Sequence, residues 1–148
     1  MKEVKIEEKV TTIKYEAIDG ELFSVKSQCI AYEETVACLL KSKIKKLIIK
    51  EVNSEDLFGF YVCEENLSLL KVNTQEDIDN ILKLYYYYYP GYDATRLEAL
   101  LTYALNNDDI IIWRQFDSSI GGEEGFEVLT TINKLKQSLN ENTCMNQN

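Results

Sequence analysis

Residues 15–33 read YEAIDGELFSVKSQCIAYE, and their pattern predicts a β-hairpin followed by a helix. Asp19-Gly20 lies between two runs that carry apolar residues. Such a pair predicts a two-residue turn of type I′, because both residues tolerate a positive φ. Ser24 is a residue type that caps helix N-termini, so we expect a helix over about 25–41. Its apolar face is predicted from the helical spacing of Val25, Cys29, Tyr32, Val36 and Leu39.

The rest of the chain alternates between strand and helix patterns. We expect a helix that begins after the cap Thr74 and ends at Pro90-Gly91, and another that Asp93 caps and Asn106 stops. The spacing of Val128, Ile132, Leu135 and Leu139 predicts a last helix, after a loop over 117–124. Strands are predicted in the second half of 43–52, over 57–63, over 68–72 and over 110–116. The first three strands, joined by short polar turns such as 53–56, predict an antiparallel meander.

These elements predict an α+β fold, with a mainly antiparallel sheet and about four helices packed on it. The 148 residues suffice for one domain and are too few for two of ordinary size. We expect that domain to span residues 1–140. Residues 141–148 are polar and lack periodicity, so they are expected to form a disordered C-terminal tail.

The composition predicts an acidic globular protein of the cytoplasm. Apolar residues make up 45% of the chain and charged residues 28%, which are globular values. No apolar run approaches the roughly 20 residues of a membrane-spanning helix, and no secretory signal is visible at the N-terminus, so no membrane contact is expected. The net charge of −9 argues against direct nucleic-acid binding, which needs a basic surface.

The residues that usually carry chemistry are scarce. The chain has no histidine, and its four cysteines share no C-x-x-C spacing, so we expect no metal ion, no cofactor and free thiols. Without histidine, a nucleophile and its base would need residues in unusual roles, and no such constellation is visible. The sequence therefore predicts no catalytic residue and a protein that is not an enzyme. The cysteines are Cys29, Cys38, Cys63 and Cys144.

A run of five tyrosines is the most unusual local feature. Five successive residues cover the whole circumference of a helix, so their own domain is not expected to bury every ring. The rings could form a protein interface or an oligomer contact, pack within the protein, or stack on nucleotide bases. The run predicts self-association, as a twofold homodimer. Its members are Tyr85, Tyr86, Tyr87, Tyr88 and Tyr89.

Trp113 and Arg114 are further candidates for binding a partner or a ligand. They lie on the predicted strand over 110–116, where neighbouring side chains point to opposite faces. An arginine on a strand with an otherwise buried pattern indicates a specific anionic partner. That partner is either a carboxylate of this protein, or a phosphate or an acidic group of another molecule.

The hairpin and helix pattern resembles the opening of many small proteins encoded by bacteriophages and prophages, over the first quarter of the chain. Phe23, Cys29 and Tyr32 are expected to pack the helix on the hairpin. The shared pattern itself names no activity. The residues that carry it are Tyr15, Ala17, Asp19, Gly20, Phe23, Cys29, Tyr32 and Glu33.

Small acidic phage proteins of this kind include inhibitors of bacterial immunity, namely anti-CRISPR proteins and Thoeris anti-defence proteins that sequester a nucleotide signal. The resemblance implies a non-enzymatic inhibitor that binds a host defence protein stoichiometrically, such as a CRISPR nuclease. Its acidic surface would occupy a basic groove of that effector in the host cytoplasm. Two alternatives stay open. One is a sponge for an anionic nucleotide signal, held by Arg114, Trp113 or the tyrosine run, and the other is a small structural or assembly protein of a phage.

Overall fold

A computed structural model of the chain describes residues 12–58, 67–116 and 124–145. Within these ranges the predicted α+β fold is confirmed, with five helices, a four-stranded antiparallel sheet and a separate two-stranded hairpin. The elements in chain order are β1 (Tyr15–Glu16), β2 (Leu22–Phe23), α1 (Lys26–Lys45), β3 (Ile48–Val52), α2 (Ser54–Phe58), β4 (Leu67–Leu70), α3 (Gln75–Tyr88), α4 (Thr95–Asn106), β5 (Ile111–Phe116), β6 (Gly125–Thr131) and α5 (Ile132–Met145).

The hairpin β1–β2 closes through a three-residue loop rather than the two-residue turn that we predicted. The Gly20 N–H donates to the Ala17 carbonyl at 2.8 Å, and the Ala17 N–H donates to the Glu21 carbonyl at 2.8 Å. Gly20 has a φ of +92°, whereas Asp19 is not among the described residues with positive φ. A type I turn followed by a left-handed glycine has this geometry, and it matches the twist of the flanking strands as a type I′ turn would.

Helix α1 begins one residue later and ends four residues later than predicted. Its N-cap is Val25, which makes no side-chain cap, and the Ser24 hydroxyl instead accepts a hydrogen bond from the Lys14 ammonium at 2.6 Å. The predicted apolar face is wrong at its two ends, since Val25 is exposed and Leu39 is 62% exposed. The face changes along the helix because its first half meets the hairpin and its second half meets α3. The buried residues of α1 are Cys29, Ala37, Leu40 and Ile44.

Side chains of the hairpin and of α1 hold these two elements together. The Tyr32 hydroxyl donates to Asp19 Oδ2 at 2.7 Å, and the Ile18 N–H donates to Glu33 Oε1 at 3.1 Å. The rings of Phe23 and Tyr32 lie 5.1 Å apart, and Cys29 is buried. The predicted packing of the helix on the hairpin is therefore confirmed.

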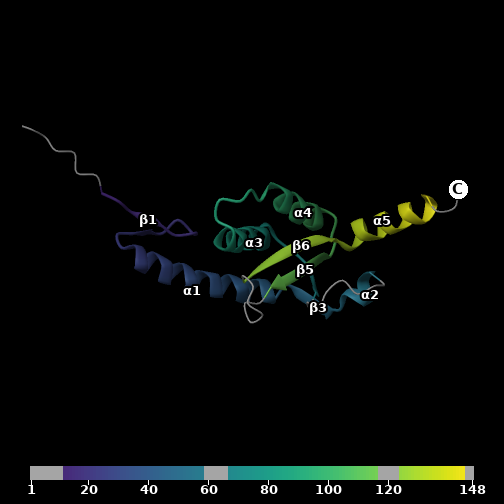
Figure 1. Cartoon of the computed structure of the whole chain (residues 1–148), viewed down its shortest axis with the longest axis horizontal. Coiled ribbons are helices and arrows are strands. Elements are labelled where there is room, and N and C mark those ends of the chain that lie inside the picture. Colours follow the sequence, from purple (N-terminus) through teal and green to yellow (C-terminus); the bar gives the residue numbers. More distant parts are fainter. Residues whose placement is uncertain (1–11, 59–66, 117–123, 146–148) are drawn as a thin grey trace, which may run out of the picture.

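The four strands of the main sheet follow the order β3-β4-β5-β6, and every neighbouring pair is antiparallel. Helices α3 and α4 lie together over the sheet, while the hairpin and α5 lie at opposite ends of the molecule (Figure 1). The core fills the space between α1, α3, α4 and the sheet. It comprises Ala37, Leu40, Ile44, Leu70, Val72, Ile78, Ile81, Leu84, Leu101, Ala104, Ile111, Trp113 and Phe126.

The connection between β3 and β4 differs from the predicted meander. Residues 54–58 form the short helix α2, where we predicted a polar turn and the start of a strand. The remainder of the predicted strand, 59–63, lies outside the described residues. Since β3 pairs directly with β4, the sheet needs no strand from this segment between them.

Helix α3 has the boundaries that its capping residues predict, whereas α4 begins one residue later than the predicted cap Asp93 implies. Thr74 and Asp77 form a capping box at the start of α3, which ends just before Pro90-Gly91, where Gly91 has a φ of +83°. The carboxylate of Asp93 accepts a hydrogen bond from the Thr95 N–H at 2.9 Å, although the N-cap position of α4 is Ala94. The predicted strand over 110–116 is confirmed as β5.

The C-terminal segment differs from the prediction, first because Val128 lies on strand β6 and not on the last helix. Val128 pairs with Trp113 of β5, and its buried neighbour Phe126 also points to the core. The alternation of apolar and polar residues over 126–128 fits a strand as well as Val128 fits the helical spacing. Second, helix α5 continues to Met145, into the segment for which a disordered tail was predicted.

None of the helices in the described ranges is both long enough and apolar enough to cross a bilayer. The 20 residues of α1 include charged side chains throughout its length. Acidic residues occur in its first half and lysines in its second half.

The contact between Tyr32 and Asp19 generates a test of the hairpin and helix unit. The hydrogen bond from Tyr32 lowers the pKa of Asp19 below its ordinary 3.8, so it stabilises the fold above that pH and is lost as the pH falls through the folded-state pKa. In Tyr32→Phe the pKa of Asp19, followed by carbon NMR of its carboxyl group, is expected to rise toward 3.8. The matched control Tyr103→Phe, on α4, should leave it unchanged. An Asp19 that titrates identically in wild type and Tyr32→Phe would contradict this contact.

Candidate functional site

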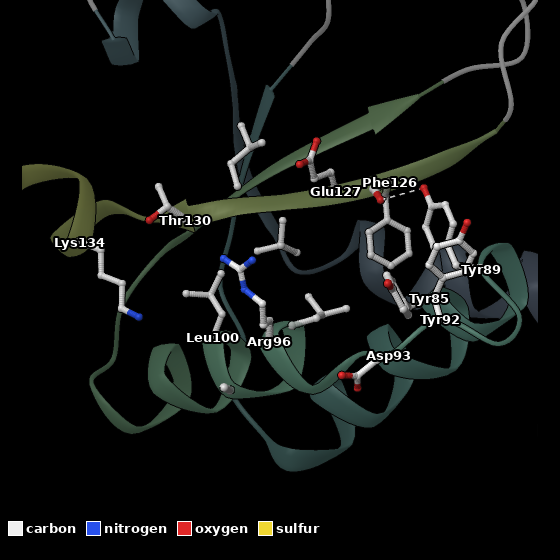
Figure 2. A pocket seen from close by; sticks show the side chains of 14 residues that line it. Tyr85, Tyr89, Tyr92, Asp93, Arg96, Leu100, Phe126, Glu127, Thr130 and Lys134 are labelled. Carbon is white, nitrogen blue, oxygen red and sulfur yellow. Dashed lines mark hydrogen bonds between the residues drawn. The ribbon is translucent and has the colours of Figure 1, made fainter. Parts of the chain in front are cut away.

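A groove of about 890 Å³ lies between α4 and β6, and it is the candidate site (Figure 2). Its volume is within the range of ligand pockets in proteins, roughly 300–1,000 Å³. Helix α4 forms one wall and strand β6 the other, the end of α3 closes one end, and Lys134 of α5 lies at the opposite end. The groove thus joins two parts of the chain that are far apart in the sequence, α3 with α4 and β6 with α5.

The closed end of the groove is aromatic, and Phe126 organises it. The ring of Phe126 stacks on the buried Trp113 at a centroid distance of 4.1 Å and an interplanar angle of 13°. Three tyrosine rings of the run meet Phe126 edge-on, at 6.2, 6.2 and 6.4 Å, and the Tyr89 hydroxyl donates to the Phe126 carbonyl at 3.1 Å. These rings belong to Tyr85, Tyr88 and Tyr89.

The tyrosine run is therefore largely packed within its own domain, which was one of the three alternatives that the sequence left open. Of its five residues Tyr86 is exposed, at 45%, and the other four are partly buried. Tyr85 and Tyr89 also line the groove, so they combine packing with access to a ligand. The predicted homodimer stays a prediction, and its premise of uncovered rings now depends on Tyr86.

Tyr88 and Lys41 connect the end of α3 to α1 and to the start of β6. The Tyr88 hydroxyl donates to Glu124 Oε1 at 3.1 Å, Lys41 forms an ion pair with Glu124, and the ammonium of Lys41 lies 5.3 Å from the centroid of the Tyr88 ring. Burial lowers the pKa of Lys41, but the hydrogen bonds to Glu124 and Tyr88 outweigh it and raise that pKa above its ordinary value. Lys41 is therefore charged, and it holds the aromatic end in place.

Trp113 and Arg114, the other two binding candidates from the sequence, do not line the groove. Trp113 is only 3% exposed and belongs to the core. Arg114 forms an ion pair with Glu127, which lies directly opposite it on β6. Of the two partners considered for Arg114, the structure thus contains the carboxylate of the protein itself.

The charged side chain that enters the middle of the groove is Arg96 of α4. Figure 2 shows its guanidinium directed from α4 toward β6, in the space between them. Arg96 makes no hydrogen bond or ion pair within the part of the chain that the structure describes. Lys134 lies 4.3 Å from the centroid of the Tyr103 ring, in a cation–π contact.

The two acidic residues of the groove lining are engaged elsewhere. Glu127 projects from the far side of β6, away from Arg96, and pairs with Arg114 (Figure 2). Asp93 accepts hydrogen bonds from the hydroxyl and the N–H of Thr95, which lower the pKa of its carboxyl group and keep it ionised. The charge that faces the middle of the groove is consequently positive, in a protein whose net charge is −9.

The lining supplies several kinds of group that can bind a ligand. It offers aromatic rings, a guanidinium, an ammonium and hydroxyls, and it contains no histidine, cysteine or serine. Over the described ranges no cluster of three or more His, Cys, Asp or Glu could hold a metal ion. Aromatic faces beside a cation suit a planar or anionic ligand.

The sequence did not single out Tyr92, Arg96 or Lys134 as candidate site residues. Tyr92 is 68% exposed at the groove and lies 6.3 Å from the Tyr89 ring, measured between centroids. A signal was present, because Arg96 is one of only two arginines in the chain and lies four residues after Tyr92. Recognising the site required the pairing of α4 with β6, which no local pattern gives.

No family model matches this chain, and no curated protein or solved structure matches it either. Its function is therefore inferred from the chemistry of its own side chains.

The different surroundings of the two arginines predict different effects on stability. Arg114→Gln removes a partly buried ion pair across two strands, so we expect the free energy of unfolding to fall by about 1 kcal/mol. Arg96→Gln removes no contact within the described residues and should change it by less than about 0.5 kcal/mol. Urea denaturation at low and moderate salt measures both. The assignment of Arg96 to ligand binding would be contradicted by a loss of stability in Arg96→Gln that matches the loss in Arg114→Gln.

Proposed function

We propose that this chain is a non-enzymatic binding protein that inhibits a bacterial defence system by holding its target stoichiometrically. The groove between α4 and β6 carries the proposal, because it is concave, is lined with rings and presents Arg96, which forms no hydrogen bond or ion pair with the residues that the structure describes. Convergent apolar surface with a few polar groups is the usual composition of a binding site. The setting in antiviral defence is supported by the hairpin and helix pattern that this chain has in common with small phage proteins.

Sequestration of an anionic signal molecule agrees best with this groove. A sponge needs an accessible cavity, a cation that is not already neutralised, and no catalytic group that would consume the ligand. Arg96 supplies the cation, while Glu127 points away and Asp93 is hydrogen-bonded to Thr95. Held in this way, the signal would be withdrawn from its receptor without being changed.

A second candidate function, inhibition of an effector such as a CRISPR nuclease, is favoured by a different part of the molecule. Exposed acidic side chains gather on the hairpin and on the first half of α1, the end of the molecule that lies away from the sheet (Figure 1). Such an end could enter a basic groove, and charge complementarity would speed association and make it sensitive to salt. Its exposed acidic residues include Glu16, Glu21 and Glu34.

One plating experiment tests the proposed function. The full chain is expressed in bacterial hosts that each carry one defence system, and the plating efficiency of a sensitive phage is measured. We expect restored plating in at least one host, because a bound target no longer acts. Restoration in none of them would contradict an inhibitory function and would favour a structural or assembly role in a phage.

Variants then separate the two modes of binding in the host that responds. Arg96→Gln combined with Tyr92→Ala should abolish restoration if the groove holds the target, whereas Lys136→Gln on the exposed side of α5 should preserve it. The triple change Glu16→Gln, Glu21→Gln and Glu34→Gln should abolish restoration if the acidic end docks on an effector. Loss in the triple variant alone would contradict the groove as the site.

A further inference from the structure

We propose that the groove between α4 and β6 binds a mononucleotide-type ligand, with its base on the exposed Tyr92 ring and its phosphate at the Arg96 guanidinium. This inference rests on the proposed function, because it names the class of ligand for the same groove. It commits to a small ligand with one or two negative charges. A protein segment in the groove is the competing outcome.

The aromatic end of the groove provides a face for a planar ring. Tyr92 is exposed, and behind it the rings of Tyr89 and Tyr85 rest on Phe126, so the outer ring is backed by a rigid aromatic cluster. Any nucleotide base can stack on such a ring, because every base has a π face. The hydroxyl of Tyr89 is already used by the Phe126 carbonyl, which fixes the orientation of its ring.

The phosphate position follows from the charges around the groove. The Arg96 guanidinium presents planar paired donors, the geometry that suits a phosphate. Figure 2 shows it in the middle of the groove, between α4 and β6, with the aromatic rings toward one end and Lys134 toward the other. The chain distance agrees, since Tyr92 lies just before α4 and Arg96 lies in its first turn. A base and a phosphate of one nucleotide could therefore be held together.

The charges of the groove and of the whole protein limit how many phosphate groups the ligand can carry. The groove has one arginine in its middle, and the remaining cation, Lys134, lies at the far end over Tyr103. Asp93 stays ionised at the rim, and the net charge of −9 opposes the approach of a polyanion. A nucleotide with few charges fits this balance better than a triphosphate or a nucleic-acid strand.

Isothermal titration of the full chain with AMP, GMP, 3′,5′-cyclic AMP, ATP, adenosine and inorganic phosphate tests the inference. We expect at least one of the first three to bind with a stoichiometry of one, and both adenosine and inorganic phosphate to bind at least about tenfold more weakly, because each lacks one of the two contacts. The absence of measurable binding for all of the mononucleotides at millimolar concentration would overturn it.

Matched variants assign the two contacts. Arg96→Gln and Tyr92→Ala should each weaken binding about tenfold or more, Tyr92→Phe should retain it, and Lys136→Gln should leave it unchanged. Unchanged affinity in Arg96→Gln would overturn the phosphate position.

The plating assay separates a failure of this inference from a failure of the proposed function. Restored plating that depends on Arg96, with no mononucleotide bound, would refute only the ligand and favour a protein segment in the groove. Mononucleotide binding without restored plating in any host would refute only the inhibitory function.

Discussion

The stacking of Phe126 on Trp113 is the contact on which the arrangement of the helices and the groove depends. Both residues are buried on neighbouring strands, and their rings are nearly parallel at 4.1 Å. Three tyrosine rings from the end of α3 and its C-cap contact Phe126 edge-on, which ties the helix to the sheet. Because an aromatic side chain contributes a large apolar area together with specific ring contacts, one residue of β6 can position the end of α3.

The same cluster explains why a chain with five successive tyrosines keeps most of them covered. At the edge of the cluster, the Tyr88 hydroxyl donates a hydrogen bond to Glu124, and the Tyr89 hydroxyl donates one to the Phe126 carbonyl. On the other side of the cluster lies the groove, where the polypeptide leaves α3 through Pro90-Gly91 and turns into α4. That turn brings Tyr92 to the aromatic end and places Arg96 in the first turn of α4. The same aromatic cluster consequently packs α3 on the sheet and lines the groove.

Local patterns predicted much of the fold and little of the site. The capping box at Thr74, the stop at Pro90-Gly91 and the packing of Tyr32 on the hairpin were foreseen, because each depends on residues close in sequence. The strand at Val128 was missed, because a short apolar run fits helix and strand equally well. Arg96 was missed as a site residue because the sequence does not show which of the two arginines is paired within the protein. The pairing of Arg114 with Glu127 depends on the register of β5 and β6. The candidate site is made of long-range contacts, which a local pattern does not contain.

Amide hydrogen exchange of Phe126→Leu measures most directly whether the Phe126 ring holds the tyrosine segment against the sheet. The account predicts that amide protection in residues 84–88 of α3 falls by about tenfold or more, since removing ring contacts raises the population of locally opened states. The hydrogen-bonded amides of Ala17 and Gly20, in the distant hairpin, should keep their protection, and Val128→Ala on the same strand should have the smaller effect on α3. Unchanged protection over 84–88, or a loss of equal size in the hairpin, would contradict the central role of the Phe126 contact.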